Sequence, residues 1–413
     1  MYNFAIILYT LCIKIASLFN NKAKEWVNGR KNVFQEIKNT VPGNDIIWFH
    51  CSSLGEYEQG VPVMELVKKY FPQYKILVTF FSPSGYIHKK KISAVDYYFY
   101  LPADTKRNAA HFVDIVKPLM AVFVKYDFWY NYIDKLHREN IPMVFISCNF
   151  RDDQIFFGKM GFWFRKELKK ITHFFVQNTH SKELLNNIGV EGVTIAGDTR
   201  YDRVAKIASS EYHDEKINTF KGRNKLLVLG SSWEEDETMI KNSLPTLKGV
   251  KILIAPHVVS ENNIRRIAGL FDNKIYRYTE YGGEHEYDIM ILDCIGILSL
   301  LYRYADYVYV GGGFGKGIHN TLEPAVYAKP VIFGPKYQKF NEAVTLVNEH
   351  CGFSIKNKHD FEDIFSKLTD EDFYGEAKSN CEKVIKENLG ASDIIVLKIS
   401  ELIRRTKKSL QTV

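Results

Sequence analysis

Short apolar runs alternate with polar, helix-like segments over most of the 413-residue chain, and this rhythm constrains the fold more than any other feature. It predicts βαβ units, in which helices such as residues 61–70 and 108–116 connect parallel strands and cover both faces of a sheet. The expected strands form two series, at residues 46–50, 76–80, 97–101, 119–124, 143–147, 174–177 and 193–196, and then at 226–229, 251–255, 289–292, 307–310 and 330–333. The chain is therefore expected to be an α/β protein.

A polar stretch at residues 201–225 separates the two series and contains no strand-like run. Because single hydrophobic cores stop growing at about 250–300 residues, two doubly wound domains are expected. We predict an N-terminal segment at 1–30, a first domain at 31–205 and a second domain at 206–413 that includes a long terminal helix, 394–410. Two such domains would face a cleft, and such sheets bind ligands at the carboxyl ends of their strands.

Residues 4–19 are almost entirely apolar, but Lys14 interrupts them and they fall short of the roughly 20 residues that a spanning helix needs. The basic residues that follow would suit anionic lipid headgroups on the cytoplasmic side. They are Lys22, Lys24, Arg30 and Lys31. An interfacial membrane anchor fits this pattern, whereas a helix packed on the protein's own core and a single spanning anchor stay open.

Composition limits the possible partners only loosely. The net charge of +7 suits anionic lipid, phosphorylated sugar or nucleic acid, but no nucleic-acid-binding motif is present. The six cysteines form no CxxC pair and the histidines form no HExxH motif, which argues for a reducing compartment and against structural zinc.

Five glycines occur within residues 311–317, directly after the expected strand at 307–310. Neither common phosphate motif fits, because Val310 stands where the Walker pattern needs glycine and Lys316 stands where the dinucleotide fingerprint needs its third glycine. A strand, a tight turn and a helix N-terminus would suit an anionic ligand, since glycines allow close backbone approach. A merely tight turn is the alternative.

Three loops of the first half carry candidate catalytic groups. Glu56 lies three residues after Ser53, which is the spacing of a helix-capping box, but a carboxylate at this corner could also act as a general base toward a hydroxyl acceptor. Lys125 and Asp127 follow another strand and form either an ion pair or part of the same site. Arg200 could balance a departing phosphate or pair with a neighbouring aspartate, Asp198 or Asp202.

Four loops of the second half are expected to meet at one edge of its sheet. One is residues 230–236, which offers hydroxyls and amides at a helix start, and Glu323 of another is placed to accept hydrogen bonds from ribose hydroxyls unless it is simply exposed. The other candidate ligand contacts are Pro256, His257, Gly296, Ile297, Leu298, Asn320, Thr321 and Leu322.

In this order, these blocks resemble the 3-deoxy-D-manno-octulosonic acid (Kdo) transferases of lipopolysaccharide assembly, which are glycosyltransferases of the two-domain GT-B architecture. The resemblance runs from about residue 46 to about residue 346, with the N-terminal anchor as a further match. The residues that carry it are 52–56, 79–85, Asn149-Phe150-Arg151, 197–202, 319–324 and Gly334-Pro335.

The resemblance implies inverting transfer of Kdo from CMP-Kdo to a hydroxyl of a tetraacylated lipid A precursor (lipid IVA), without a metal, at the bacterial inner membrane. It assigns the catalytic base to Glu56, transition-state stabilisation to Lys125 or Asp127 and to Arg200, and CMP binding to Pro256, His257, 296–298 and 320–323. The chain departs from the family where a carboxylate becomes Lys125, an arginine becomes His257 and a lysine becomes Arg200. Another UDP-sugar transferase or epimerase, and a non-catalytic nucleotide-sugar-binding membrane protein, are the alternatives.

Overall fold

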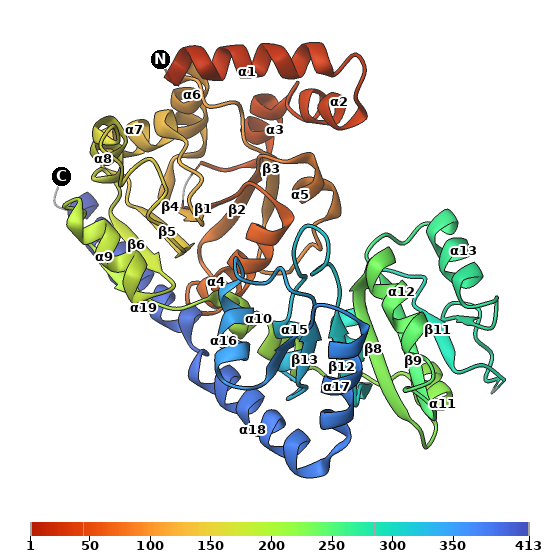
Figure 1. Ribbon diagram of the computed structural model, residues 1–413. Coiled ribbons are helices and arrows are strands. Elements are labelled where there is room, and N and C mark those ends of the chain that lie inside the picture. The colour runs from red at the N-terminus through yellow and green to blue at the C-terminus, as the bar shows by residue number, and fades with distance from the viewer. Residues whose placement is uncertain (1, 44, 285, 412–413) are drawn as a thin grey trace. The chain divides into compact units, whose positions relative to one another are not determined.

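The computed structural model describes residues 2–43, 45–284 and 286–411; Met1 and residues 412–413, at the outer ends of the predicted domains, lie outside the described residues. The chain forms two compact units. Unit 1 comprises the chain up to Arg203 together with the residues from Leu389 onward, and unit 2 comprises Val204–Asn388. Each unit is a parallel sheet covered by helices (Figure 1).

Unit 1 contains a seven-stranded sheet of order β3-β2-β1-β4-β5-β6-β7 in which neighbouring strands are parallel. Its strands are β1 (Ile46–Cys51), β2 (Lys75–Phe80), β3 (Tyr97–Tyr100), β4 (Pro118–Val124), β5 (Met143–Cys148), β6 (His173–Val176) and β7 (Val193–Ile195). Its helices are α1 (Tyr2–Ala16), α2 (Asn21–Asn28), α3 (Val33–Thr40), α4 (Leu54–Tyr70), α5 (Pro83–His88), α6 (Lys106–Val116), α7 (Tyr130–Arg138), α8 (Phe162–Leu168), α9 (Thr179–Asn187) and α19 (Ala391–Gln411), with α10 (Thr199–Ala208) crossing the boundary between the units.

Unit 2 repeats this architecture with a seven-stranded sheet of order β10-β11-β9-β8-β12-β13-β14. Its strands are β8 (Lys225–Ser232), β9 (Val250–Pro256), β10 (Tyr276–Arg277), β11 (Ile289–Ile291), β12 (Tyr307–Val310), β13 (Val331–Phe333) and β14 (Gly352–Ser354). Its helices are α11 (Glu215–Lys221), α12 (Glu234–Ser243), α13 (Glu261–Leu270), α14 (Leu298–Leu301), the 3-10 helix η1 (Tyr302–Tyr304), α15 (Leu322–Ala325), α16 (Asn341–Asn348), α17 (Lys358–Thr369) and α18 (Glu371–Glu387).

The predicted α/β class is confirmed, and every expected strand is present within a few residues of its expected bounds. The two strands that the sequence analysis missed, β10 and β14, have two and three residues, which is too short to produce a recognisable apolar run. Helix α4 begins at Leu54, earlier than the apolar pattern indicated, because the capping residue Ser53 starts it.

Alternating residues of the central strands fill two separate cores in unit 1. Trp48 and Phe123 pack on one face of the sheet, whereas Phe49 and Val122 pack on the other. All of these side chains are fully buried. Near-continuous apolar strands of this kind are expected for a parallel sheet with helices on both faces.

The terminal helix α19 was predicted to belong to the second domain, and the structure shows that this was wrong. Its buried residues Ile395, Ile399 and Ile403 join the core of unit 1 that lies against α4 and β4. Asp202 fixes the start of the helix by accepting hydrogen bonds from the N–H groups of Gly390 and Ser392, both at 2.7 Å. An apolar helix face shows that a partner is needed, but it does not show which sheet provides that partner.

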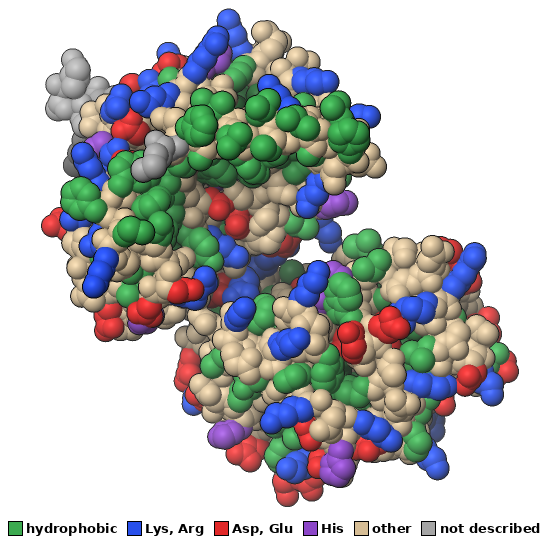
Figure 2. Space-filling view, turned by 45° about the horizontal axis from the view of Figure 1, so that its top comes forward, with side chains coloured by type: hydrophobic (Ala, Val, Ile, Leu, Met, Phe, Trp, Pro, Cys, Tyr) green, Lys and Arg blue, Asp and Glu red, His purple; other side chains and the backbone are tan. Residues whose placement is uncertain are grey.

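The first helix, α1, has no buried residue and shows a row of exposed apolar side chains along the edge of unit 1 (Figure 2). Among the described residues, no single helix is long and apolar enough to cross a membrane. Helices α1 and α2 together are long and apolar enough for a membrane span, but they are bent by 120° at the break between them.

We predict that Ile399→Ala destabilises unit 1 by about 2–5 kcal/mol, because it leaves a cavity in a fully buried site. Hydrogen exchange monitored by mass spectrometry should show faster exchange in α4 and β4. The control is Leu397→Ala on the same helix, where the side chain is 73% exposed and the cost should stay within about 0.5 kcal/mol. Faster exchange confined to Val204–Asn388 would contradict the assignment of α19 to unit 1.

Candidate active site

Unit 1 places three of its candidate catalytic residues, Glu56, Lys125 and Asp127, at the point where the strand order reverses, whereas Arg200 follows the edge strand β7. The chain moves from β1 outward to β2 and β3 and then returns to β4 on the other side of β1. The carboxyl ends of β1 and β4 lie side by side, with His50 opposite Phe123. Loops that leave two neighbouring strands in opposite directions open a crevice at such a position, where α/β sheets usually bind ligands.

Glu56 sits in the first turn of α4, immediately after β1, and is 9% exposed. The capping box expected from the sequence is present. The Ser53 N–H donates to Glu56 Oε2 at 3.1 Å, and the Glu56 N–H donates to Ser53 Oγ at 3.4 Å. The cap uses one carboxylate oxygen and leaves the other to face the loop after β4.

Asp127 and Lys125 enter the same region from the loop after β4. Lys125 adopts a left-handed backbone conformation with φ of 66°, which turns the chain sharply at the end of the strand. One carboxylate oxygen of Asp127, Oδ2, is buried with no hydrogen-bond partner among the described residues. An unpartnered buried oxygen of this kind is costly unless a ligand group meets it.

Burial raises the pKa of both carboxyl groups, and the charge of Asp127 adds to the rise at Glu56. Burial, followed by the nearby charge of Asp127, raises the pKa of Glu56 to about 8, although the Lys125 ammonium opposes this change. Burial also raises the pKa of Asp127, while hydrogen bonding from Ser52 and Glu56 and the charge of Lys125 act in the opposite direction. Glu56 is therefore a strong base for a glutamate, and Lys125 moderates that basicity.

A chain of hydrogen bonds through His50 connects the loops that carry this pair. Trp129 Nε1 donates to His50 Nε2 at 2.8 Å, and Ser52 Oγ lies 3.2 Å from the same nitrogen. His50 Nδ1 lies 2.9 Å from Thr79 Oγ1. Burial, with a further contribution from the Arg30 charge, lowers the pKa of His50 to about 3, so the ring is neutral and acts as a spacer between strands.

Arg200 is engaged with Asp198 in the structure. Its Nε lies 2.9 Å from Asp198 Oδ2, and one terminal nitrogen lies 2.6 Å from the same oxygen. Asp202 instead accepts the two backbone N–H groups at the start of α19. The ion-pair alternative raised by the sequence is therefore present with Asp198.

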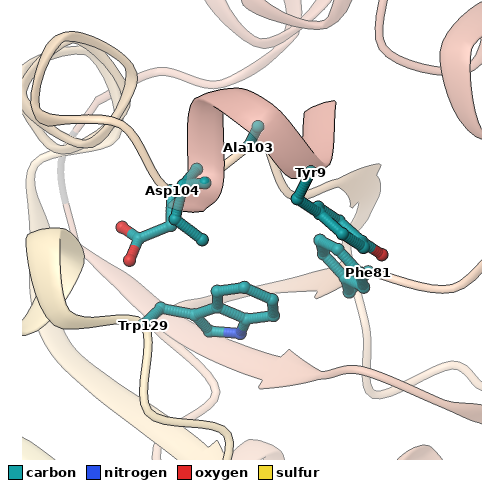
Figure 3. A pocket seen from close by; sticks show the side chains of 6 residues that line it. Tyr9, Phe81, Ala103, Asp104 and Trp129 are labelled. Atoms are coloured by element: carbon teal, nitrogen blue, oxygen red, sulfur yellow. The ribbon is translucent and has the colours of Figure 1, made fainter. Parts of the chain in front are cut away.

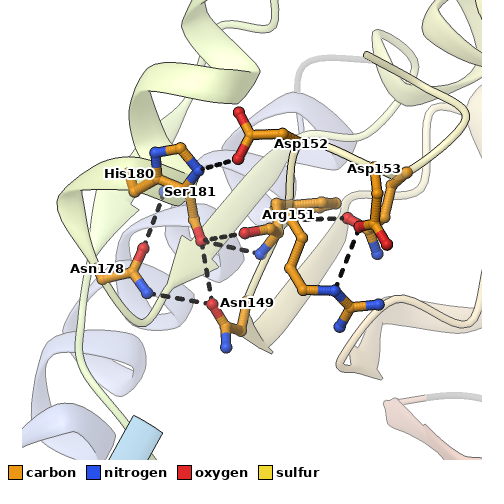
Figure 4. Close-up of polar contacts among 9 residues, drawn as sticks. Asn149, Arg151, Asp152, Asp153, Asn178, His180 and Ser181 are labelled. Atoms are coloured by element: carbon orange, nitrogen blue, oxygen red, sulfur yellow. Dashed lines mark hydrogen bonds and ion pairs between the residues drawn. The ribbon is translucent and has the colours of Figure 1, made fainter. Parts of the chain in front are cut away.

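The Asn149-Phe150-Arg151 segment after β5 forms a polar turn that packs against the start of α9 (Figure 4). Asn149 Oδ1 accepts a hydrogen bond from Asn178 at 3.1 Å, and Ser181 Oγ accepts one from the Phe150 N–H at 2.8 Å. The Arg151 side chain is exposed and lies beside Asp153. These contacts show that the segment stabilises the loop after β5, which the family resemblance did not predict.

In unit 2, the loops that carry the predicted nucleotide contacts follow neighbouring strands. In sheet order these strands are β11, β9, β8, β12 and β13, so their loops share the carboxyl edge of the sheet. The point at which the strand order reverses lies between β8 and β12. The sheet topology therefore brings these loops to one edge, as predicted for the second domain.

Three rings stack at this edge. The His257 ring lies 4.7 Å from the Trp233 ring and 4.4 Å from the His319 ring, with interplanar angles of 21° and 23°. Trp233 Nε1 donates to His319 Nε2 at 3.0 Å. Partial burial, with a contribution from the His257 charge, lowers the pKa of His319 to about 4, so the stack is uncharged near neutral pH.

The glycine loop after β12 is held by backbone contacts. A Cβ atom at Gly313 would lie 2.5 Å from Gly334 Cα, so the loops after β12 and β13 can approach only if both positions are glycine. Buried Asp236 accepts the N–H groups of Gly312 and Trp233, each at 2.9 Å, and thereby joins the loops after β8 and β12. The expected helix does not begin directly after the glycines, because α15 starts only at Leu322 and has four residues.

The remaining predicted contacts surround this loop. Asn320 Oδ1 accepts the Leu322 N–H, and the Asn320 amide donates to Glu323, both at 3.1 Å. Thr321 is buried and its hydroxyl has no hydrogen-bond partner among the described residues. Pro256 ends β9, and Gly296, with φ of 100°, turns the chain into Ile297 and the first residue of α14, Leu298.

Sequence reasoning missed the ring partners. Trp233 and His319 both lay inside segments that the sequence analysis singled out, but neither was assigned a binding role. Trp233 directly follows β8, whereas His319 lies nine residues after the end of β12, beyond the glycines, so only Trp233 had a positional signal in the sequence. In the described part of the chain, no group of three or more His, Cys, Asp or Glu side chains is arranged to hold a metal ion.

Comparisons with known proteins show which family the chain resembles. Residues 25–203 match the model of the 3-deoxy-D-manno-octulosonic-acid transferase (kdotransferase) family. A 3-deoxy-D-manno-octulosonic acid transferase of Rickettsia bellii is 23% identical over 375 residues, which cover 88% of each chain. The chain is a relative of the Kdo transferases. The matches confirm the resemblance and the glycosyltransferase class that the sequence predicted.

This Kdo transferase relative also resembles a bifunctional enzyme in sequence and an epimerase in structure. A bifunctional glycosyltransferase/methyltransferase of Fusobacterium nucleatum subsp. nucleatum is 26% identical over 385 residues, and the chain spans 58% of its length. The solved structure of UDP-GlcNAc 2-epimerase from Neisseria meningitidis aligns with a TM-score of 0.61 at 16% identity, covering 86% of this chain and 99% of that one. The structural likeness confirms the fold.

We predict that Glu56 in this Kdo transferase relative titrates near pH 8, well above the usual glutamate value of about 4.3. Asp127→Asn should lower the Glu56 pKa by removing a negative neighbour, whereas Lys125→Met should raise it by removing a positive one. Carbon-13 NMR of glutamate-labelled protein, with Glu56→Gln used to assign the signal, measures these values. A midpoint near 4.3 that neither substitution moves would contradict the proposed electrostatics.

Proposed function

We propose that the protein catalyses inverting transfer of Kdo from CMP-Kdo to a hydroxyl of a tetraacylated lipid A precursor, with Glu56 as the general base. The observation that carries the proposal is the buried pair of Glu56 and Asp127 at the reversal point of the domain that matches the Kdo transferase family. A base whose pKa lies near the working pH is the most effective in proton transfer, which is the property that burial confers on Glu56.

The proposed step balances as a single displacement. The acceptor oxygen forms a bond to the anomeric carbon of Kdo and gives its proton to Glu56, while the bond from that carbon to the phosphate oxygen breaks. CMP leaves with the bonding electrons. Positive charge grows on the anomeric carbon during this exchange, so the carboxylate of Asp127 and the ammonium of Lys125 are placed to balance the charges that develop on donor and leaving group.

We assign the donor nucleotide to the carboxyl edge of the sheet in unit 2. The uncharged face formed by Trp233 and His257 suits a stacked base. The Glu323 carboxylate in the first turn of α15 is proposed to accept hydrogen bonds from the ribose hydroxyls, and Thr321, whose hydroxyl has no partner among the described residues, lies beside it. Pro256, Gly296, Ile297, Leu298, Asn320 and Leu322 keep their predicted places around the nucleotide in this proposal.

Arg200 is proposed to stabilise the departing phosphate. Guanidinium groups bind phosphate through paired N–H donors, and the ion pair with Asp198 orients this one at the start of α10. The proposal requires no metal ion, because cationic side chains and backbone N–H groups supply the positive charge that meets the phosphate.

Glu56→Gln tests the chemistry, because it changes the catalytic group without disturbing the helix cap. Glutamine serves equally well in a capping box, so the substitution preserves the start of α4 and removes only the basic oxygen. Transfer should fall by about 10²–10⁴-fold, the usual contribution of a general base, while CMP binding and the melting temperature stay close to those of the parent protein.

Mass spectrometry of the lipid product and of the released nucleotide reads this experiment. CMP and a Kdo-modified lipid are expected in the parent reaction, also in the presence of EDTA. Release of UDP from a UDP-sugar would favour the alternative transferase or epimerase, and nucleotide-sugar binding with no product would favour the non-catalytic alternative. Full activity of Glu56→Gln would show that Glu56 serves only as a helix cap.

We further propose that unit 1 associates with the cytoplasmic face of the inner membrane through α1 and the turn that follows it. The exposed apolar residues of this segment are Phe4, Ile7, Leu8, Tyr9, Leu11, Ile15, Leu18 and Phe19. Lys22, Lys24 and Lys31 are exposed nearby and suit anionic headgroups. Arg30 was predicted to join them, but its guanidinium donates to the carbonyls of Trp26, Leu101 and Phe81 and is already committed to the fold.

Flotation with vesicles tests this association. Leu18→Asp removes a side chain that is 75% exposed next to α1, and we expect it to weaken binding to phosphatidylglycerol vesicles by about tenfold or more, because burying a leucine contributes about 1.5–3 kcal/mol. The matched control is Leu397→Asp, at a leucine on α19 that is 73% exposed. Equal losses for the two variants, or equal binding to neutral vesicles, would contradict the proposed surface.

A further inference from the structure

A cavity of about 230 Å³ lies in unit 1 between α1 and the carboxyl ends of the strands (Figure 3). It is lined by Ile6 and Tyr9 from α1, Phe81 from the loop after β2, Ala103 and Asp104 from the loop after β3, and Trp129 from the loop after β4. In the figure the Trp129 ring forms one wall, while Tyr9 and Phe81 stand together at one side. The predicted catalytic and nucleotide-binding residues do not line this cavity.

Aromatic side chains give the cavity a continuous apolar lining. The Phe81 ring lies 4.5 Å from the Trp129 ring and 6.2 Å from the Tyr9 ring. Arg30 holds this arrangement in place, since its guanidinium donates to the Phe81 carbonyl and lies 5.2 Å from the Phe81 ring. Such a surface gains free energy by losing contact with water.

Asp104 is the one charged residue of the lining, and its carboxylate is directed to other partners. Oδ2 accepts the Tyr2 hydroxyl at 2.5 Å and the Asn131 N–H at 3.2 Å, and Oδ1 accepts the Tyr132 N–H at 3.2 Å. These bonds attach the start of α1 to the start of α7. Because the carboxylate is occupied in this way, the cavity offers little to a sugar or a phosphate.

The cavity shares a loop with the candidate active site. Trp129, which forms its wall, lies two residues after Asp127, and the Trp129 ring nitrogen donates to His50. His50 in turn contacts Ser52, which lies just before the Glu56 cap. A ligand seated against Trp129 would therefore lie beside the loops that hold the two carboxylates.

We propose that this cavity binds a segment of one acyl chain of the lipid acceptor. The proposal rests on the proposed function, because it supplies the acceptor with a position relative to Glu56. The volume exceeds the roughly 150 Å³ of an apolar cavity that holds benzene and is below the roughly 300 Å³ at which pockets for whole drug-sized ligands begin. It therefore fits part of one chain and excludes a complete lipid.

Helix α1 has two roles in this proposal. Ile6 and Tyr9 line the cavity, while Phe4, Ile7 and Leu8 on the same helix are exposed. A chain that leaves the bilayer next to the exposed residues would meet the apolar lining on the other side of the helix. The cavity would thus select acylated acceptors, with an affinity gain of about fourfold for each methylene group that it buries.

The test compares two variants in the full-length protein. Ala103→Phe fills the cavity, and Leu397→Phe places the same ring at an exposed position on a different helix, α19. The first measurement is quenching of tryptophan fluorescence by a medium-length fatty acid with a terminal bromine, which needs no catalysis. We expect quenching in the parent and in Leu397→Phe, at least a tenfold loss of affinity in Ala103→Phe, and loss of most of the signal in Trp129→Phe.

The second measurement is the ratio of kcat/KM for an acylated and a deacylated phosphorylated disaccharide acceptor. This ratio should fall at least tenfold in Ala103→Phe and stay at the parent value in Leu397→Phe. Ala103→Leu, which adds less volume, replaces Ala103→Phe if the larger residue prevents folding.

The outcomes separate the two proposals. If Kdo transfer proceeds but quenching is absent or all variants keep the parent ratio, the cavity is not an acyl site and the inference is overturned. If the brominated chain quenches Trp129 as expected but no acceptor receives Kdo, the proposed function is overturned, while the cavity is supported as an alkyl-chain site.

Discussion

Two carboxyl groups placed side by side in a buried site constrain the rest of unit 1. Glu56 and Asp127 come from loops after neighbouring strands, and only a parallel sheet whose strand order reverses between β1 and β4 brings those loops together. Burial and mutual repulsion keep a proton on Glu56 up to about pH 8. Local features maintain this costly arrangement: the Ser53 cap, the left-handed turn at Lys125, and the Trp129–His50 hydrogen bond.

Unit 2 has the same topology but presents different groups. At its reversal point between β8 and β12 the structure places stacked rings, closely packed glycines and the buried carboxyl groups of Asp236 and Glu237. Gly313 and Gly334 let two loops touch through their backbones, and Asp236 ties the loops together by accepting N–H groups. The edge of one sheet thus holds a buried pair of carboxyl groups, and the edge of the other holds flat rings and backbone hydrogen bonds.

Helices α1 and α19, near the two ends of the described chain, both belong to unit 1. Helix α19 supplies a face of its core, and Arg30 and Asp104 attach the first helices to the sheet edge through backbone carbonyls and capped N–H groups. These contacts explain two wrong expectations. The terminal helix was assigned to the second domain, and Arg30 was expected to face lipid, because amphipathic faces and charges in a sequence show what a segment requires without showing which neighbour provides it.

The sequence by itself determined most of the strands, the presence of two α/β domains and the loops that hold the candidate functional residues, because apolar runs and turn residues act over a few neighbouring positions. The Ser53–Glu56 spacing likewise predicted the helix cap that the structure contains. Only tertiary structure decided the pKa of Glu56, the ring stack of Trp233, His257 and His319, and the cavity beneath α1. Each of these depends on side chains that are distant in sequence and meet only when the sheets assemble, and burial and ring contacts have no local sequence signal.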